Sequence, residues 1–163
     1  MKFNNYETPQ LFVKKGGILA IDGEFLPKLM LDVFEKDMLF RFCARGNSMK
    51  PVIKDGDVIT VKKINYFSAR IGDIVAFVHP LSQRLIVHRI IAIRSDKFLI
   101  LGDNLACKFD GFIPKEKILG KITKIERDNH SLKFGLGLEK YFFVFLNLFK
   151  LSIIITKRVF KYH

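Results

Sequence analysis

The amino-acid sequence predicts a mainly β protein: a β-sheet or barrel core with a short helix before it and an amphipathic helix after it. Between residues 38 and 128, short apolar runs rich in Val, Ile and Phe alternate with polar turns. No long helical pattern separates these runs, and strands that follow one another directly favour an all-β architecture. With 163 residues, the chain has the size of one domain.

Residues 1–37 form an N-terminal extension of mixed character, in which a short helix is expected over Glu24–Lys36. The apolar stretch Ile18–Ile21 is too short for a signal peptide, and acidic residues interrupt it at once. No transmembrane pattern precedes the β region. These features predict a cytoplasmic protein, or one bound peripherally to the cytoplasmic membrane.

The β region, residues 38–128, contains apolar runs of strand length separated by Gly and Asp residues suited to tight turns. The turns are Asp55-Gly56-Asp57, Gly72-Asp73 and Gly102-Asp103-Asn104. The predicted strands are Leu39–Ala44, Val58–Val61, Ile74–Val78, Leu85–Ile93, Phe98–Leu101 and Ile118–Ile125.

The C-terminal region, residues 129–163, contains a strongly apolar segment over Tyr141–Thr156. If this segment is helical, its length is roughly 24 Å, which is less than the roughly 30 Å of a bilayer's hydrocarbon core. Its most polar positions lie along one stripe of the helix, and more basic residues follow it. Segment 140–161 therefore predicts a helix lying on an anionic membrane surface. A helix packed on its own domain or on a partner, and a short tilted membrane span, are the alternatives. The stripe consists of Lys140, Asn147, Lys150 and Lys157, and the following basic residues are Arg158 and Lys161.

The formal net charge of +12 is compatible with nucleic acid or an anionic membrane as a partner. No arginine-rich block, zinc-ligand spacing or aromatic RNA-binding motif accompanies the charge, so specific nucleic-acid binding is not expected. Cys43 and Cys107 form neither a disulfide framework nor a metal site by their spacing, and two free thiols are favoured over a single bridge. No metal or cofactor is expected.

Ser48 is the first residue that indicates chemistry. It lies in a loop between an apolar strand and a polar turn, where Gly46 permits close backbone approach and Pro51 restricts the exit. A serine becomes a useful nucleophile only when a base takes its proton. Of the four histidines, His88 alone stands inside a predicted strand, and imidazole titrates near the required pH. Asp103 or Asp110 could orient that histidine, and the residues alone do not choose between them.

Four motifs occur in order: Ser48-Met49-Lys50-Pro51, Gly72-Asp73-Ile74-Val75-Ala76-Phe77, His88-Arg89-Ile90-Ile91, and Gly102-Asp103-Asn104 with a following aspartate. In this order and spacing, the segment resembles the catalytic core shared by type I signal peptidases and their self-cleaving repressor relatives. The resemblance covers roughly residues 38 to 126. It implies a mostly β fold and a serine endopeptidase that cuts after a small residue, with another small residue two positions earlier.

The resemblance also implies the roles of individual residues. Ser48 would be the nucleophile and His88 the base, as in the histidine-type branch, with Asp103 and Asp110 supporting the pair. Many relatives have serine at the position of Gly46, whose hydroxyl helps to bind the oxyanion, so here backbone amides would do so, chiefly that of Ser48. Asn47 replaces the usual glycine, and Gly-Asn-Ser-Met is closer to the repressor branch. The residues expected to bind oxyanion or substrate are Gly46, Asn47, Met49 and Pro51.

The function expected from these features is removal of a leader from a small exported or modified peptide, at or near the cytoplasmic membrane. The N-terminal anchor typical of signal peptidases is missing, and the C-terminal helix is expected to take its place. The alternatives are a repressor-like protein that cleaves itself or a partner, and a non-catalytic peptide-binding module of the same fold.

Overall fold

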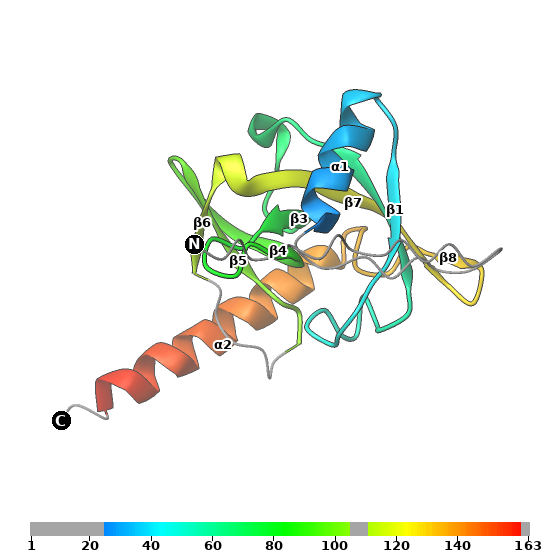
Figure 1. The fold of residues 1–163 in the computed structure, drawn as a ribbon. Helices are drawn as coiled ribbons and strands as arrows, with labels where there is room; N and C mark the ends of the chain where they lie inside the picture. Colours follow the sequence, from blue (N-terminus) through cyan, green and yellow to red (C-terminus); the bar gives the residue numbers. More distant parts are fainter. Residues whose placement is uncertain (1–24, 105–110, 161–163) are drawn as a thin grey trace, which may run out of the picture.

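A computed structural model describes residues 25–104 and 111–160, and it confirms the mainly β class. In the described residues, one antiparallel sheet contains eight strands in the order β1-β2-β7-β3-β4-β5-β6, with β8 paired to β7 (Figure 1). The strands are β1 (Phe40–Cys43), β2 (Val58–Lys63), β3 (Ile74–Val78), β4 (Leu85–Arg94), β5 (Lys97–Leu101), β6 (Phe112–Pro114), β7 (Ile118–Arg127) and β8 (His130–Leu132). Short 3-10 turns lie at Tyr66–Ser68 and Lys115–Lys117.

All six predicted strands are present within a few residues of their expected bounds. The sequence did not predict β6 and β8, which have three residues each. Strand β8 is polar and pairs with β7 through a tight turn at Asp128 and Asn129, whose φ angles of 50° and 62° suit such a hairpin. Apolar periodicity cannot reveal strands this short.

Helix α1 (Phe25–Glu35) covers one face of the sheet and confirms the predicted N-terminal helix to within one residue at each end. Its Met30 and Phe34 are fully buried in the same core as Phe40 and Ile122. The helix can approach closely because β7 carries Gly120, where a Cβ would lie 3.1 Å from the Phe34 ring. Residues 25–35 of the N-terminal extension therefore belong to the hydrophobic core of the β domain.

Helix α2 (Lys140–Phe160) follows the last strand and is longer than the predicted segment. Its first half packs on the sheet, where Phe143 and Val144 are buried. Its second half extends away from the β domain, as Figure 1 shows in orange to red. Within the part of the chain that the structure describes, no helix is long and apolar enough to cross a membrane.

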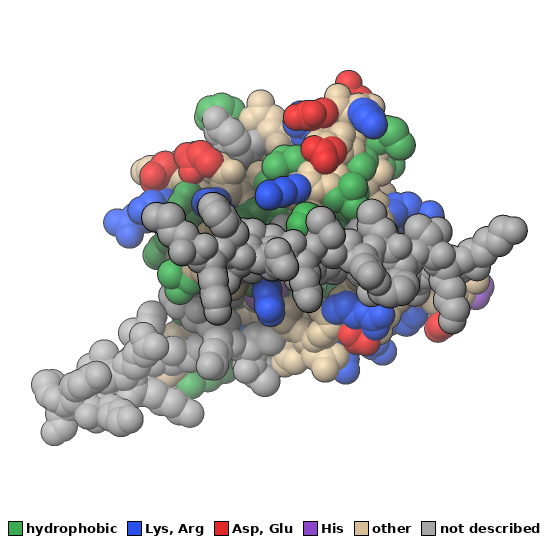
Figure 2. Space-filling view, in the orientation of Figure 1, with side chains coloured by type: hydrophobic (Ala, Val, Ile, Leu, Met, Phe, Trp, Pro, Cys, Tyr) green, Lys and Arg blue, Asp and Glu red, His purple; other side chains and the backbone are tan. Residues whose placement is uncertain are grey.

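On the coloured part of the face shown in Figure 2, the surface charge does not gather into one stripe. Lys and Arg side chains are spread over it, and acidic side chains lie over α1 and elsewhere.

Candidate active site

A pocket of about 990 Å³ lies between α1, β1 and the start of β4. This is the size of a typical ligand site. Its walls are mostly apolar, with Leu29, Phe42 and Leu85 among them, while Ser48 and His88 are two of its few polar lining residues. The two residues expected to form a nucleophile–base pair are therefore brought to one pocket from separate elements of the fold.

Ser48 lies in the loop that connects β1 to β2, and its position depends on a local carboxylate. Gly46 has a φ of 92°, a conformation that favours glycine, and its N–H donates to Asp55 Oδ1 at 2.7 Å. On the other side of Ser48, Met49 is buried in the core, and its carbonyl accepts a hydrogen bond from the Ile53 N–H at 3.0 Å. Ser48 is thus held between a turn and a buried anchor.

His88 and Arg89 are neighbours on β4, and strand geometry sends their side chains to opposite faces of the sheet. His88 lines the pocket and is 5% exposed, whereas Arg89 is fully buried on the side of α2. Its guanidinium carbon lies 5.1 Å from the centre of the Phe143 ring. The polar pair seen in the sequence therefore divides into one residue for the pocket and one for the opposite face.

Gly102 is the place where the nucleophile loop and the histidine meet. A Cβ on this residue would lie 2.5 Å from the Ser48 carbonyl oxygen and 3.0 Å from His88 Nε2. Real Cβ atoms essentially never come closer than 3.0 Å to such neighbours. The absence of a side chain at Gly102 is therefore a condition for bringing Ser48 and His88 together.

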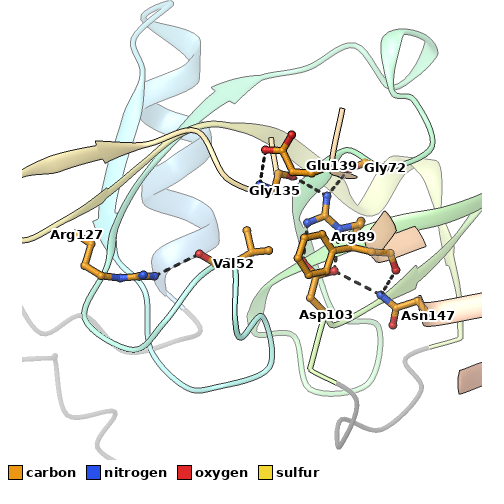
Figure 3. Close-up of polar contacts among 9 residues, drawn as sticks. Val52, Gly72, Arg89, Asp103, Arg127, Gly135, Glu139 and Asn147 are labelled. Atoms are coloured by element: carbon orange, nitrogen blue, oxygen red, sulfur yellow. Dashed lines mark hydrogen bonds and ion pairs between the residues drawn. The ribbon is translucent and has the colours of Figure 1, made fainter. Parts of the chain in front are cut away.

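Asp103 and Arg89 form a buried, two-point ion pair (Figure 3). Arg89 Nε donates to Asp103 Oδ1 at 2.8 Å, and Nη2 donates to Oδ2 at 2.6 Å. The remaining guanidinium nitrogen donates to the carbonyls of Gly72 and Gly135, at 2.7 and 3.0 Å. Of the two aspartates expected to orient His88, Asp103 thus uses both oxygens on Arg89 instead. Asp110 lies outside the described residues.

Asn104 clamps the nucleophile loop from the next position. Its backbone N–H donates to the Ser48 carbonyl at 2.9 Å, and its side-chain amide donates to the Asn47 carbonyl at 2.9 Å. Each residue of the motif Gly102-Asp103-Asn104 therefore has its own role. Gly102 lets the Ser48 loop and His88 approach, Asp103 pairs with Arg89, and Asn104 makes two hydrogen bonds to the loop. The sequence suggested only a turn or a catalytic aspartate at these positions. The one sequence feature that pointed to the contact with Arg89 was this charged residue inside the apolar strand β4, next to His88.

The expected oxyanion and substrate-binding residues lie together in the loop, but their roles differ. The Gly46 amide is occupied by Asp55, so it is not available to an oxyanion. The Asn47 carbonyl is used in the clamp, Met49 belongs to the core, and exposed Pro51 follows a cis peptide bond. The amide of Ser48 stays the proposed oxyanion donor.

Asp57 supports the far end of the same loop through a buried carboxylate. Two nitrogens of Arg127 donate to it at 2.8 and 2.7 Å, and the Lys54 N–H donates at 2.7 Å. Burial would raise the pKa of Asp57, but the hydrogen bonds and the charge of Arg127 outweigh it and lower the pKa below the ordinary value. Arg127 also reaches the Val52 carbonyl (Figure 3).

Helix α2 turns three residues of its polar stripe, Lys140, Asn147 and Lys150, toward the domain. Lys140 Nζ lies 3.3 Å from Asp73 Oδ1, and Lys150 Nζ donates to the Asn104 carbonyl at 3.1 Å. The Asn147 amide donates to Asp103 Oδ1 at 3.4 Å (Figure 3). These partners lie far away in sequence, so helical periodicity alone could not assign the stripe. The alternative of packing on the chain's own domain is confirmed for this face.

The fold and the pocket together define a mainly β domain in which a loop serine and a strand histidine line one pocket. The chain belongs to the peptidase S24-like family, whose sequence model matches residues 13–123. That family includes serine peptidases and self-cleaving repressors. A comparison with curated proteins finds no match. In the described residues, no group of three His, Cys, Asp or Glu side chains could hold a metal ion, and the Cys43 thiol is free.

Proposed function

We propose that the protein is a serine endopeptidase that removes leader or signal peptides by cutting after a small residue. One observation carries the proposal: Ser48 and His88 line one pocket and both converge on Gly102. A serine and a histidine in such an arrangement can perform nucleophilic catalysis without a metal. The small residue before the cut is implied by the likeness to signal peptidases.

The steps of the reaction use these two side chains in turn. Ser48 Oγ attacks the carbonyl carbon of the scissile bond while the imidazole of His88 accepts its proton. The negative charge on the carbonyl oxygen is stabilised by backbone N–H donors, chiefly that of Ser48. The imidazolium then protonates the leaving amine, and the C–N bond breaks. Water hydrolyses the acyl-enzyme by the same route, returning the proton to Ser48.

The substrate is expected to bind as an extended strand, because two strand edges border the pocket. Among the described strands, β1 lies at one edge of the sheet, and residues 40–44 line the pocket. Strand β5 pairs with β4 only from Arg89 onward, so the described strands leave the outer edge of residues 85–88 without a neighbour. Those residues line the pocket too. A peptide between these edges gains backbone hydrogen bonds that do not depend on its sequence.

The experiment that tests the proposal is cleavage of a peptide library, read by mass spectrometry. Wild type is compared with Ser48→Ala and His88→Ala, and with Ser131→Ala and His130→Ala as controls, because these two residues are exposed on β8. Cuts after small residues are expected from wild type and from both controls, and from neither site variant. Cutting that survives Ser48→Ala contradicts the proposal.

A second candidate is a self-cleaving regulator, favoured by the family match and by the Gly-Asn-Ser-Met sequence at residues 46–49. It uses the same serine and histidine, but its target is its own chain. Mixing the inactive Ser48→Ala protein with wild type separates the two functions. Cleavage confined to the wild-type chain, with no cut in any added peptide, favours the regulator.

A further inference from the structure

The outward face of α2 is apolar, which reverses the usual arrangement of a helix on a water-exposed surface. We call this face the aromatic face, and it consists of Tyr141, Phe142, Phe145, Leu148, Phe149 and Ile153. Phe142, Phe145 and Phe149 are 59%, 64% and 60% exposed. Between residues 141 and 153, no exposed position of the helix carries a charge. A contiguous apolar surface of this kind marks an interaction site.

The helix cannot hide these side chains by rotating about its axis, because its opposite face is tied to the domain. Lys140 and Lys150 contact the Asp73 carboxylate and the Asn104 carbonyl, and Asn147 contacts Asp103. Buried Phe143 and Val144 lie between these polar contacts. A rotation that buried the aromatic face would break all of them and expose those two apolar side chains. The outward direction of the aromatic face is therefore built into the fold.

We propose that the aromatic face of α2 docks the protein on a bilayer that contains anionic lipid, with the helix lying in the plane of the membrane. From Tyr141 to Ile153 the face spans roughly 18 Å along the helix. Its phenylalanines insert at the boundary of headgroups and acyl chains. Lys157, Arg158 and Lys161 follow in the sequence and supply positive charge for lipid phosphates.

The net charge favours an anionic bilayer over a second copy of the chain as the partner of the aromatic face. The protein carries a net charge of +12, so two copies repel each other, whereas an anionic bilayer attracts each one. The three basic residues that follow the aromatic face in the sequence add to this attraction. Docking of this face on lipid does not depend on the proposed peptidase reaction.

The experiment uses the full chain and exploits its lack of tryptophan. Phe145→Trp introduces a single fluorophore on the aromatic face, and Phe67→Trp places one at a 74% exposed control position away from α2. Each protein is mixed with vesicles of phosphatidylcholine alone or with added phosphatidylglycerol. With anionic vesicles, the emission of the residue-145 variant is expected to shift to shorter wavelength, and that of the control is not.

Flotation of the same vesicles supplies an independent measurement. Phe145→Asp/Phe149→Asp is expected to lower the bound fraction about tenfold or more, because two exposed apolar side chains become charged. Phe67→Asp/Leu81→Asp is the matched control, since both residues are exposed elsewhere on the domain. Its binding is expected to equal that of wild type. All of these positions are exposed, so unchanged far-UV circular dichroism is expected for each variant.

Several results would overturn the lipid proposal. These are wild-type protein that stays in the buffer with every vesicle, binding that survives the helix substitutions, and equal binding to vesicles with and without anionic lipid. Concentration-dependent dimerisation that the helix substitutions abolish, without vesicle binding, would assign the face to a second copy. Ser48→Ala is expected to float like wild type, so failure of the peptidase proposal leaves this test intact.

Discussion

The buried ion pair between Arg89 and Asp103 yields a stability prediction that does not require a substrate. Arg89→Met removes the guanidinium and leaves the Asp103 carboxylate, which is 4% exposed, without its two strongest contacts. Breaking a buried pair by removing one partner costs about 3–5 kcal/mol. The carbonyls of Gly72 and Gly135 also lose their donor, which favours the upper half of that range.

The expected loss of about 4 kcal/mol is a large share of the roughly 5–15 kcal/mol that stabilises a typical domain. For a chain of this size, it corresponds to a fall in Tm of about 8–16 °C. Urea unfolding followed by far-UV circular dichroism measures the free energy of unfolding directly, and a thermal scan provides the Tm.

Arg41→Met is the matched control, because Arg41 also pairs with a carboxylate at 2.6 Å, but its side chain is 57% exposed. Exposed ion pairs contribute about 0–1 kcal/mol, so this variant is expected to unfold almost like wild type. Burial, and not bond length, then accounts for the difference between the two arginines.

The double variant Arg89→Met/Asp103→Leu tests whether the unpaired Asp103 carboxylate causes the loss of stability. Removing both charges leaves no uncompensated carboxylate, so the double variant is expected to be more stable than Arg89→Met alone. Two results would refute the reasoning: a loss below about 1 kcal/mol in Arg89→Met, or a loss in the double variant that equals the sum of the two single losses.

Two further predictions concern the loop that carries Ser48. A Cβ at Gly102 would displace the Ser48 carbonyl and crowd His88, so Gly102→Ala is expected to lower kcat about 100-fold, since a shift of about 1 Å can have this effect. Gly56→Ala is strained at φ 90° but has open space for its Cβ, so it should lower only the Tm; equal kcat values for the two variants would contradict this prediction. The lowered pKa of Asp57 means that its pairing with Arg127 stabilises the fold above the unfolded value of 3.8 and is lost as the pH falls through the folded value. In urea unfolding, Asp57→Asn is therefore less stable than wild type at pH 7, and this difference shrinks in acid; a difference that is constant from pH 7 to pH 3 argues against the pair.

The sequence predicted what local chemistry encodes. Six strands of the sheet and both helices follow from apolar runs, turn residues and helical spacing, and the structure contains all of them. His88 drew attention because it is a polar residue inside an apolar strand, and Ser48 because it lies in the first of four motifs whose order resembles the signal-peptidase core. Both residues line one pocket. The order of the four motifs predicted this pairing, because the periodicity of a single strand or loop does not show which distant residues lie together.

Tertiary structure decided how the polar residues are paired. The sequence left Asp103 and Asp110 as equal partners for His88, whereas the folded chain gives Asp103 to Arg89. Nothing local to Asp103 specifies this choice, because the pair depends on how β4 and the segment after β5 lie side by side. The clamp from Asn104 to the Ser48 loop has the same origin.

Helix α2 is the clearest example of a feature that the sequence did not determine, namely which of its faces packs on the domain. Helical periodicity established two faces, one with Lys140, Asn147 and Lys150 and one with aromatic side chains. Periodicity could not establish which face packs on the β domain, because the pattern is the same whether the polar or the aromatic face points inward. Partners at Asp73, Asp103 and Asn104 decide the matter, since the nearest of these is more than forty residues away in the chain. Their carboxylates and carbonyl attract the polar face, and the aromatic face is left to the outside.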